Sequence, residues 1–217
     1  MVFWIDCIKK FILDIIFPTD CFGCEKEGEL VCEDCFQKIM PSVRSFYGEN
    51  LDKIITFYSY DDKIIKNLIH GLKYRFVEDS ARYIGKLVER ELGKILEQIG
   101  CPDIFSPVPL HKKRYLERGF NQGEEIAKFL VTKIGWPLRT DILVRVRETV
   151  SQVSLKEEAR KKNVEGAFGL LGNSDIKNKK IVLLDDVVTT GATMEECARV
   201  LKQAGAKEVL GLAFARG

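Results

Sequence analysis

The sequence lacks the glycine-rich fingerprints of two common nucleotide-binding folds. No GxxxxGK(S/T) segment occurs, so a P-loop phosphate site has no support, and no GxGxxG segment occurs, so a dinucleotide fold has none either. The sequence also lacks a large excess of charge of either sign, because it has 34 Lys and Arg and 32 Asp and Glu, for a net charge of +2. Bulk charge therefore says little about partners, and any anion site must come from local clustering.

There is also no apolar run long enough to form a transmembrane segment. Residues 1–17 are apolar, but charges such as Asp6 and Lys9 interrupt them, and the basic start and cleavage site of a signal peptide are absent. The helical spacing of their apolar residues predicts an amphipathic helix docked on the rest of the chain, with a helix lying on a membrane surface as the alternative. Without a secretory signal we expect a cytoplasmic protein, in which clustered cysteines more often bind metal than form disulfides.

Four of the seven cysteines stand in two CxxC pairs within residues 18–45. Cys21 and Cys24 form the first pair, Cys32 and Cys35 the second, and seven residues separate the pairs. Two CxxC pairs joined by a short linker can place four thiolates around one Zn²⁺. The protein would fill every coordination position, so the zinc would be structural and would supply folding free energy to this small knuckle. A reduced redox pair or an iron site is the alternative.

Residues 46–217 alternate between strand-like and helix-like segments. Strands are expected at 53–60, 103–110, 140–147, 179–186 and 207–216, with helices at 61–75, 80–99, 122–134 and 192–205. This alternation predicts parallel βαβ units, and therefore an α/β domain whose sheet is covered by helices on both faces.

The segment "IVLLDDVVTTGAT", residues 181–193, combines an apolar strand with paired acids and a glycine among threonines. In an open parallel sheet, ligands bind beyond the carboxyl ends of the strands, where these acids fall. One carboxylate can accept hydrogen bonds from sugar hydroxyls while the other helps to hold Mg²⁺. Glycine and the N–H groups of the following helix suit a phosphate. A plain strand–helix junction with a capping Thr is the alternative. The candidate site residues are Asp185, Asp186, Val187, Val188, Thr189, Thr190, Gly191, Ala192 and Thr193.

This segment resembles the 13-residue phosphoribosyl-pyrophosphate motif of type I phosphoribosyltransferases. The resemblance implies that Asp185 and Asp186 are the catalytic pair facing the ribose hydroxyls, and that Thr189 to Thr193 surround the 5′-phosphate. It also implies phosphoribosyl pyrophosphate, or a related sugar phosphate, as a ligand together with Mg²⁺. In the purine-salvage members the position of Thr189 is usually Asp, and Thr cannot act as an ionised base, which argues against purine salvage by that route.

The segment "PVPLHKKRYLERGFNQ" forms a second anion-binding candidate after a predicted strand. Lys and Arg at the carboxyl end of a strand can bind a pyrophosphate, whereas a solvated basic loop is the alternative. By resemblance, residues 110–113 lie where type I enzymes place their pyrophosphate loop. The candidates are Leu110, His111, Lys112, Lys113 and Arg118.

Residues 145–163 are rich in polar and cationic side chains. By resemblance they correspond to a mobile loop that closes over the reacting centre and excludes water. A solvent-exposed charged helix is the alternative. The candidates are Arg145, Arg147, Gln152 and Arg160.

These motifs, in this order and with the Cys-rich head and "LKYR" at 72–75, resemble the ComF family of competence-associated and GntX-like proteins. The resemblance covers residues from about 10 to the end. It implies a phosphoribosyltransferase-like protein with an unidentified acceptor and a role in natural transformation beside the DNA-uptake machinery. The residues themselves leave both a monomer and an oligomer open. The alternative is a non-catalytic module for single-stranded DNA, in which the knuckle and basic loops bind phosphates while Tyr115 and Phe120 stack on bases.

Overall fold

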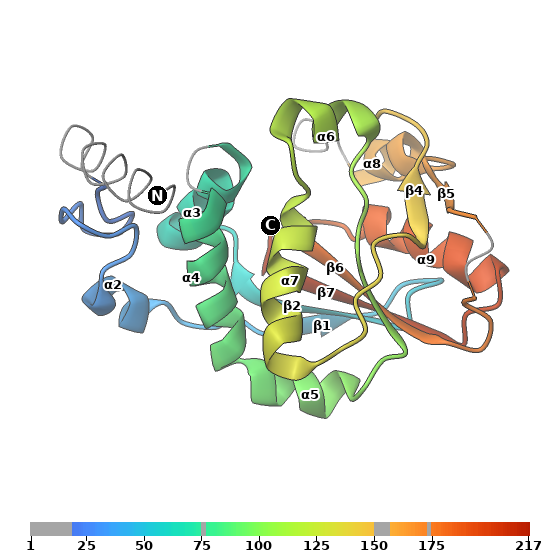
Figure 1. Ribbon diagram of the computed structural model, residues 1–217, viewed down its shortest axis with the longest axis horizontal. Coiled ribbons are helices and arrows are strands. Elements are labelled where there is room, and N and C mark those ends of the chain that lie inside the picture. The colour runs from blue at the N-terminus through green and yellow to red at the C-terminus, as the bar shows by residue number, and fades with distance from the viewer. Residues whose placement is uncertain (1–18, 75–76, 150–156, 173–174) are drawn as a thin grey trace, which may run out of the picture.

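The computed structural model describes residues 19–74, 77–149, 157–172 and 175–217 (Figure 1). The helix predicted over residues 1–17 and the candidate Gln152 lie outside the described residues. Within the described ranges, no helix has both the length and the apolar character needed to cross a membrane.

A five-stranded sheet with the order β1-β2-β7-β6-β3 forms the centre of the molecule. Strands β2, β7, β6 and β3 run parallel, and β1 pairs antiparallel at one edge. A separate two-stranded sheet pairs β4 with β5. The strands are β1 Arg44–Phe46, β2 Lys53–Ser59, β3 Ile104–Pro107, β4 Leu143–Arg145, β5 Phe168–Leu170, β6 Lys180–Val188 and β7 Glu208–Arg216. The predicted α/β class with a mostly parallel sheet is confirmed.

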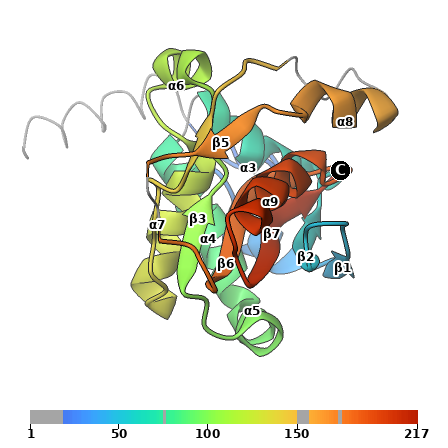
Figure 2. The same ribbon diagram turned by 90° about the vertical axis from the view of Figure 1, so that its right-hand side faces the viewer.

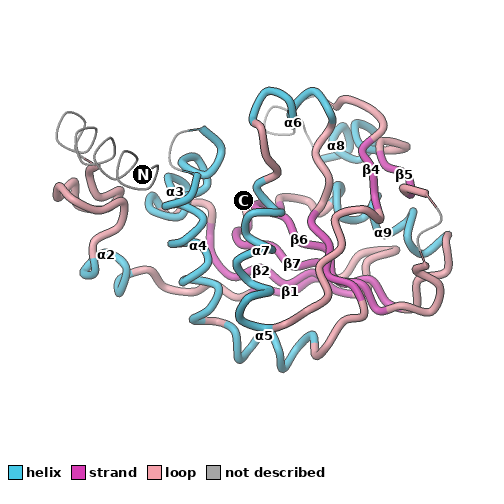
Figure 3. Tube along the Cα trace, viewed as in Figure 1, coloured by secondary structure: helices cyan, strands magenta, loops and turns pink. Residues whose placement is uncertain are grey.

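Helices cover both faces of the large sheet, with α9 on the face opposite to α3, α4 and α7 (Figure 2). The described helices are α2 Glu33–Lys38, α3 Lys63–Tyr74, α4 Val77–Arg90, α5 Leu92–Ile99, α6 Lys112–Arg118, α7 Gln122–Ile134, α8 Glu157–Val164 and α9 Ala192–Gln203. The basic segment that sequence reasoning treated as a loop is largely the helix α6 (Figure 3).

Strand β6 separates two hydrophobic cores because successive side chains of a strand point to opposite faces. Val182 and Leu184 belong to the core formed with α3, α4 and α7, whereas Ile181 and Leu183 belong to the core formed with α9. The strand is therefore buried on both sides, as its unbroken apolar run predicts.

The carboxyl end of β6 extends beyond its neighbour β3. The pairing with β3 ends at Leu184 and Pro107, whereas the pairing with β7 continues to Val188 and Arg216. The strand runs two residues past the predicted end at 186, and its last residues have a strand neighbour on one side only. This exposed edge opens the space in which the candidate site lies.

The Cys-rich segment packs against the helical face of the domain rather than standing apart from it. Cys21 and Cys35 belong to the same buried core as Ile65 and Ile69 of α3. A Cβ atom on Gly23 would lie only 2.9 Å from Ile64 Cδ1, so glycine permits this close approach.

Candidate functional site

Asp186, at the end of β6, is held by a cation from α3. Its Oδ2 atom lies 2.6 Å from Lys73 Nζ, and its Oδ1 atom accepts a hydrogen bond from the Val187 N–H at 2.8 Å. The adjacent Asp185 Oδ1 accepts the Asp186 N–H at 2.9 Å. Asp186 is only 9% exposed, and Asp185 is half-buried. The pair is therefore largely shielded from bulk water, yet it lines the cleft described below.

The two carboxyl groups differ in their preference for charge. Burial, together with the negative charge of Asp186, raises the pKa of Asp185 well above its usual value. Burial also opposes ionisation of Asp186, but the Lys73 ammonium group outweighs it and lowers the pKa of Asp186. Asp186 is therefore the carboxyl group that favours the ionised form. Asp185 favours the neutral form, and a cation bound beside it would favour its ionisation.

A cleft of about 400 Å³ opens over the acidic pair. In addition to Lys73 of α3, arginine side chains reach it from three elements that are distant in the sequence: Arg114 and Arg118 of α6, Arg145 of β4, and Arg160 of α8. Acids at the base of a cleft with arginines around it suit an anionic ligand that carries a metal ion, because guanidinium groups bind phosphate oxygens in a bidentate manner.

The threonine-rich loop 189–193 forms a wall between two cavities. Thr189 and Thr193 line the cleft over the acidic pair, as does Val187. Thr190, Gly191 and Ala192 line a second cavity on the other side of the loop, and Val188 is buried. Seven of the nine candidate residues of this segment also line one small cavity of about 10 Å³ beside the loop: Asp185, Val187, Val188, Thr189, Gly191, Ala192 and Thr193.

Gly191 is the N-cap residue of α9 and has the left-handed conformation, with φ of +81°, while Thr190 Oγ1 accepts the Ala192 N–H at 3.4 Å. A Cβ atom at this position would lie 3.0 Å from Ile54 Cδ1 and 3.3 Å from Phe46 Cε2. Glycine is thus required both for the backbone conformation and for close packing. The first-turn N–H groups of α9 have no intrahelical acceptor, which favours an anion at this end of the helix.

Only part of the predicted basic segment faces the cleft. Leu110 and Arg118 line it, but His111, Lys112 and Lys113 are not among its described lining residues. His111 instead caps α6, because its Nδ1 atom accepts the Lys113 N–H at 3.4 Å. Lys113 Nζ forms an exposed ion pair with Glu148 at 3.0 Å. The helical conformation of α6 thus directs its successive cations to different surroundings.

The residues predicted to belong to a mobile loop do not all line the cleft. Arg145 and Arg160 line the cleft. Arg147 instead donates to the backbone oxygens of Asn163 and Glu165, at 3.0 and 2.6 Å, and so links the end of β4 to the end of α8.

Arg145 is oriented by Phe168 of the small sheet and by Thr149 in the segment after β4. Its guanidinium group stacks on the Phe168 ring, with 5.1 Å to the ring centroid, and donates to Thr149 Oγ1. Burial and the nearby Arg114 lower the pKa of Arg145. Its Nε atom is buried and has no hydrogen-bond partner among the described residues. A ligand acceptor in the cleft would relieve both the repulsion and the unsatisfied donor.

Several lining residues were absent from the sequence-predicted set, among them Lys73, Arg114 and Gln122. Lys73 follows Ile69 by four residues, so it falls on the buried stripe of α3, where a lysine requires a counter-charge. This pattern could have identified it. Asn121 caps α7, since its Oδ1 atom accepts the Gly123 N–H at 2.9 Å while its Nδ2 atom donates to Val108 O at 2.9 Å.

The four clustered cysteines could hold a metal ion. The Sγ atoms of Cys21, Cys24, Cys32 and Cys35 all lie within 4.8 Å of one another, and those of Cys24 and Cys32 are 3.6 Å apart. Thiolates around tetrahedral zinc lie about 3.8 Å apart. Burial opposes ionisation of Cys21, but backbone N–H donors, including those of Gly23 and Cys32 at 3.4 Å, lower its pKa to about 6.

Comparisons with known proteins agree with this architecture. A family model described as a phosphoribosyl transferase domain matches residues 121–215. The chain is 37% identical to competence protein ComFC of Streptococcus pneumoniae, over 97% of this chain and 86% of that protein. It is 31% identical to DNA utilization protein YhgH of Escherichia coli, over 84% of this chain and 76% of that protein. It is 27% identical to competence protein F of Haemophilus influenzae, over 90% of each. The chain therefore belongs to the ComF family and is related to the type I phosphoribosyltransferases.

Proposed function

We propose that the cleft over Asp185 and Asp186 binds phosphoribosyl pyrophosphate, or a closely related sugar phosphate, with Mg²⁺, and that the protein is a phosphoribosyltransferase. One observation carries the proposal: a single cleft gathers the acidic pair, two threonines of the 189–193 loop and four arginines. These groups match the three parts of the donor, which are the ribose hydroxyls, the 5′-phosphate and the pyrophosphate.

The acidic pair suits the ribose and the metal ion. Carboxylate oxygens accept hydrogen bonds from hydroxyl groups, and they are ligands that Mg²⁺ prefers. Asp185 and Asp186 would hold the ion, and its positive charge would favour the ionised form of Asp185, whose pKa is otherwise raised. When bound, Mg²⁺ neutralises charge on the pyrophosphate leaving group.

Hydroxyl groups, N–H groups and cations that can bind the phosphate groups of the donor line the cleft on the loop 189–193, on α9 and on α6. Thr189 and Thr193 offer hydroxyl groups beside the first turn of α9, which suits the 5′-phosphate. Arg114 and Arg118 of α6 face the same cleft and suit the pyrophosphate. These contacts would hold both ends of the donor and leave ribose C1 between them.

The transfer follows from that orientation. A nucleophilic acceptor attacks ribose C1 as the bond between C1 and the pyrophosphate oxygen breaks, and the leaving group departs with the electron pair. The arginines stabilise the negative charge that develops on the pyrophosphate. Arg145 and Arg160 lie where they can help to keep water from the positively charged ribose centre.

Titration calorimetry with phosphoribosyl pyrophosphate and Mg²⁺ tests the proposal. The variant Asp185→Asn/Asp186→Asn should bind the donor at least about tenfold more weakly than the wild type, because it loses both anions. The matched control Glu97→Gln/Asp175→Asn removes two exposed carboxylates that do not line the cleft and should bind normally. Equal affinities of the acidic-pair variant and the control would refute the site.

We also infer that the cysteine cluster holds a structural Zn²⁺. Support comes from four sulfur ligands within 4.8 Å of one another and from backbone N–H donors to Cys21 Sγ. With all four positions taken by thiolates, the ion would have no open position for catalysis.

A second candidate function is binding of single-stranded DNA during natural transformation, beside the DNA-uptake machinery. It is favoured by the cationic face of α6, where Tyr115 is 46% exposed next to Arg114, and by relatives named for competence and DNA utilization. Affinity for an oligonucleotide should fall steeply as salt concentration rises. A flat salt dependence, or no binding at low salt, would exclude this function.

A further inference from the structure

Buried polar atoms without a hydrogen-bond partner are concentrated at the cleft over the acidic pair. Four such side-chain atoms occur in the described ranges, and three belong to residues that line this cleft: Gln122 Nε2, Arg145 Nε and Asp186 Oδ2. Asp186 Oδ2 has the Lys73 ammonium group at 2.6 Å, so two donor atoms remain unpaired. A buried donor without an acceptor costs free energy, and it therefore calls for a ligand that supplies one.

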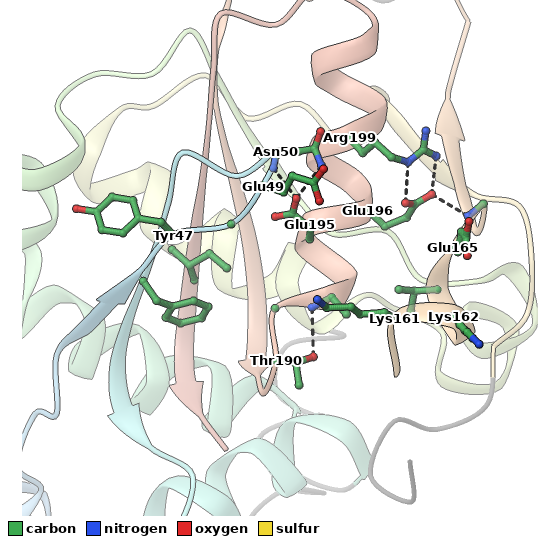
Figure 4. Close-up of a pocket in the computed structure, with 17 residues that line it drawn as sticks. Tyr47, Glu49, Asn50, Lys161, Lys162, Glu165, Thr190, Glu195, Glu196 and Arg199 are labelled. Atoms are coloured by element: carbon green, nitrogen blue, oxygen red, sulfur yellow. Dashed lines mark hydrogen bonds and ion pairs between the residues drawn. The ribbon is translucent and has the colours of Figure 1, made fainter. Parts of the chain in front are cut away.

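The larger cavity on the other side of the 189–193 loop, of about 760 Å³, differs in this respect (Figure 4). None of its described lining residues carries a buried side-chain atom without a partner. Glu195 accepts a hydrogen bond from Asn50 Nδ2 at 2.8 Å, and Glu196 accepts two from Arg199, at 2.8 and 2.7 Å. The protein itself satisfies these carboxylates, so the unpaired donors are a property of the cleft over the acidic pair.

The first unpaired donor belongs to Gln122, the first residue of α7, which is only 3% exposed. The backbone around it is anchored to two strands. Asn121 Nδ2 donates to Val108 O, just after β3, at 2.9 Å. Gly123 packs against β6, where a Cβ atom would lie 3.2 Å from Leu184 O. Gln122 is therefore held at the carboxyl ends of β3 and β6, while its carboxamide nitrogen is left without an acceptor.

This position lies on the α6 side of the cleft. Helix α6 ends at Arg118, four residues before Gln122, and both Arg118 and Arg114 line the cleft. The 189–193 loop leads instead from β6 into α9, on the face of the sheet opposite to α7 (Figure 2). In the proposed function the 5′-phosphate lies at that loop and the pyrophosphate lies at α6. Gln122 is therefore on the pyrophosphate side.

The second unpaired donor, Arg145 Nε, belongs to the same side. The backbone of Arg145 forms an isolated β-bridge with His111, which is the N-cap residue of α6. Its guanidinium group is held by Phe168 and Thr149, so the direction of Nε is fixed. Residues before and after α6 in the sequence are thus each paired with an element that carries one unsatisfied donor. An anion with several acceptor oxygens could pair both.

We propose that Gln122 is a binding residue for the pyrophosphate end of the donor, and that its carboxamide nitrogen donates a hydrogen bond to a phosphate oxygen. The inference rests on the proposed function and adds to it a neutral contact among the arginines. Because the donor is unpaired until the ligand binds, Gln122 destabilises the ligand-free protein. An apolar side chain of similar length should therefore weaken ligand binding without loss of stability, whereas a glutamine with a structural role would behave in the opposite way.

The variant Gln122→Met tests the proposal on the full chain, because Met is about as long as Gln and has no N–H donor. In titration calorimetry with Mg²⁺ it should bind phosphoribosyl pyrophosphate and inorganic pyrophosphate about tenfold more weakly than the wild type, and ribose 5-phosphate within about twofold. Without ligand, it should unfold at the same urea concentration as the wild type or at a higher one. The control Gln98→Met changes an exposed glutamine of α5 that does not line the cleft and should bind all three probes normally.

Three results would overturn the inference and leave the proposed function standing. The first is equal affinity of Gln122→Met and the wild type for phosphoribosyl pyrophosphate. The second is weaker binding of ribose 5-phosphate with unchanged binding of pyrophosphate, which would assign Gln122 to the other end of the donor. The third is a lower unfolding midpoint of ligand-free Gln122→Met. Failure of the wild type to bind phosphoribosyl pyrophosphate would refute the proposed function, and the inference with it.

Discussion

Lys73 Nζ lies 2.6 Å from Asp186 Oδ2, which joins α3 to the carboxyl end of β6. The same helix packs through Ile65 and Ile69 into the core that contains Cys21. One helix therefore links the candidate acidic pair to the cysteine cluster.

Replacement of Lys73 by Met should lower the free energy of unfolding by about 2 kcal/mol at pH 7, because Asp186 would stay largely buried without its cation. The variant Lys73→Arg keeps the positive charge and should lose less. Urea denaturation of both variants measures the difference. Equal stability of the Met and Arg variants would show that the ion pair contributes nothing.

The two aspartates should affect stability in opposite directions. The pKa of Asp185 is raised in the folded protein, whereas in the unfolded chain this carboxyl group ionises near its usual value of about 3.9. The free energy of unfolding of the wild type therefore falls as pH rises from about 3.9 to the pKa of the folded state. In the absence of Mg²⁺, Asp185→Asn should therefore be more stable than the wild type by about 1 kcal/mol at pH 7, and no more stable near pH 3.

The control for that measurement is the neighbouring variant Asp186→Asn. The pKa of Asp186 is lowered, so its stabilisation is present above about pH 3.9 and disappears as pH falls through the folded pKa. This variant should be less stable than the wild type at pH 7, with the deficit shrinking in acid. The same sign for both variants across a series of urea titrations would contradict the assigned charges.

Adjacent residues of α6 should differ in their effect on the donor. Arg114 lines the cleft, whereas Lys113 forms an exposed ion pair with Glu148. Arg114→Ala should weaken binding of phosphoribosyl pyrophosphate about tenfold, and Lys113→Ala should leave it within about twofold. Since each variant removes one positive charge from the same helix, similar losses would point to a diffuse electrostatic effect instead of a contact.

Loss of a cysteine ligand should destabilise the neighbouring α/β domain as well as the Cys-rich segment. Cys35→Ser is expected to abolish bound zinc and to lower the free energy of unfolding by at least about 2 kcal/mol, because Cys35 belongs to the core shared with α3. Cys101→Ser changes an exposed thiol outside the cluster and serves as the control. Elemental analysis that finds one zinc per chain in the Cys35 variant would rule out the assigned ligand set.

The sequence carried most of the architecture because its strongest signals come from burial. The apolar run that ends at Leu184 predicted a strand covered on both faces, and β6 is buried on both faces. The spacing of the cysteines predicted a cluster, and their sulfur atoms converge. Patterns of burial can be recognised in a sequence because apolar residues recur with the period of the helix or strand.

Elements without a buried face could not be found in this way. Helix α6 has no buried residue, so no apolar stripe marked it, and the identity of its cleft-facing cations depends on that helix. The helix predicted over 80–99 is in fact two, because α4 ends at Arg90 and α5 begins at Leu92. Buried Glu91 lies between them and binds Lys94 at 2.7 Å, a contact that hydrophobic periodicity does not reveal.

A crystal structure of the protein with phosphoribosyl pyrophosphate and Mg²⁺ would show whether the donor occupies this cleft. We expect density for the 5′-phosphate beside Thr189 and Thr193, and for the ribose over Asp185 and Asp186. Density for the donor away from this cleft, or an empty cleft at saturating donor, would contradict it.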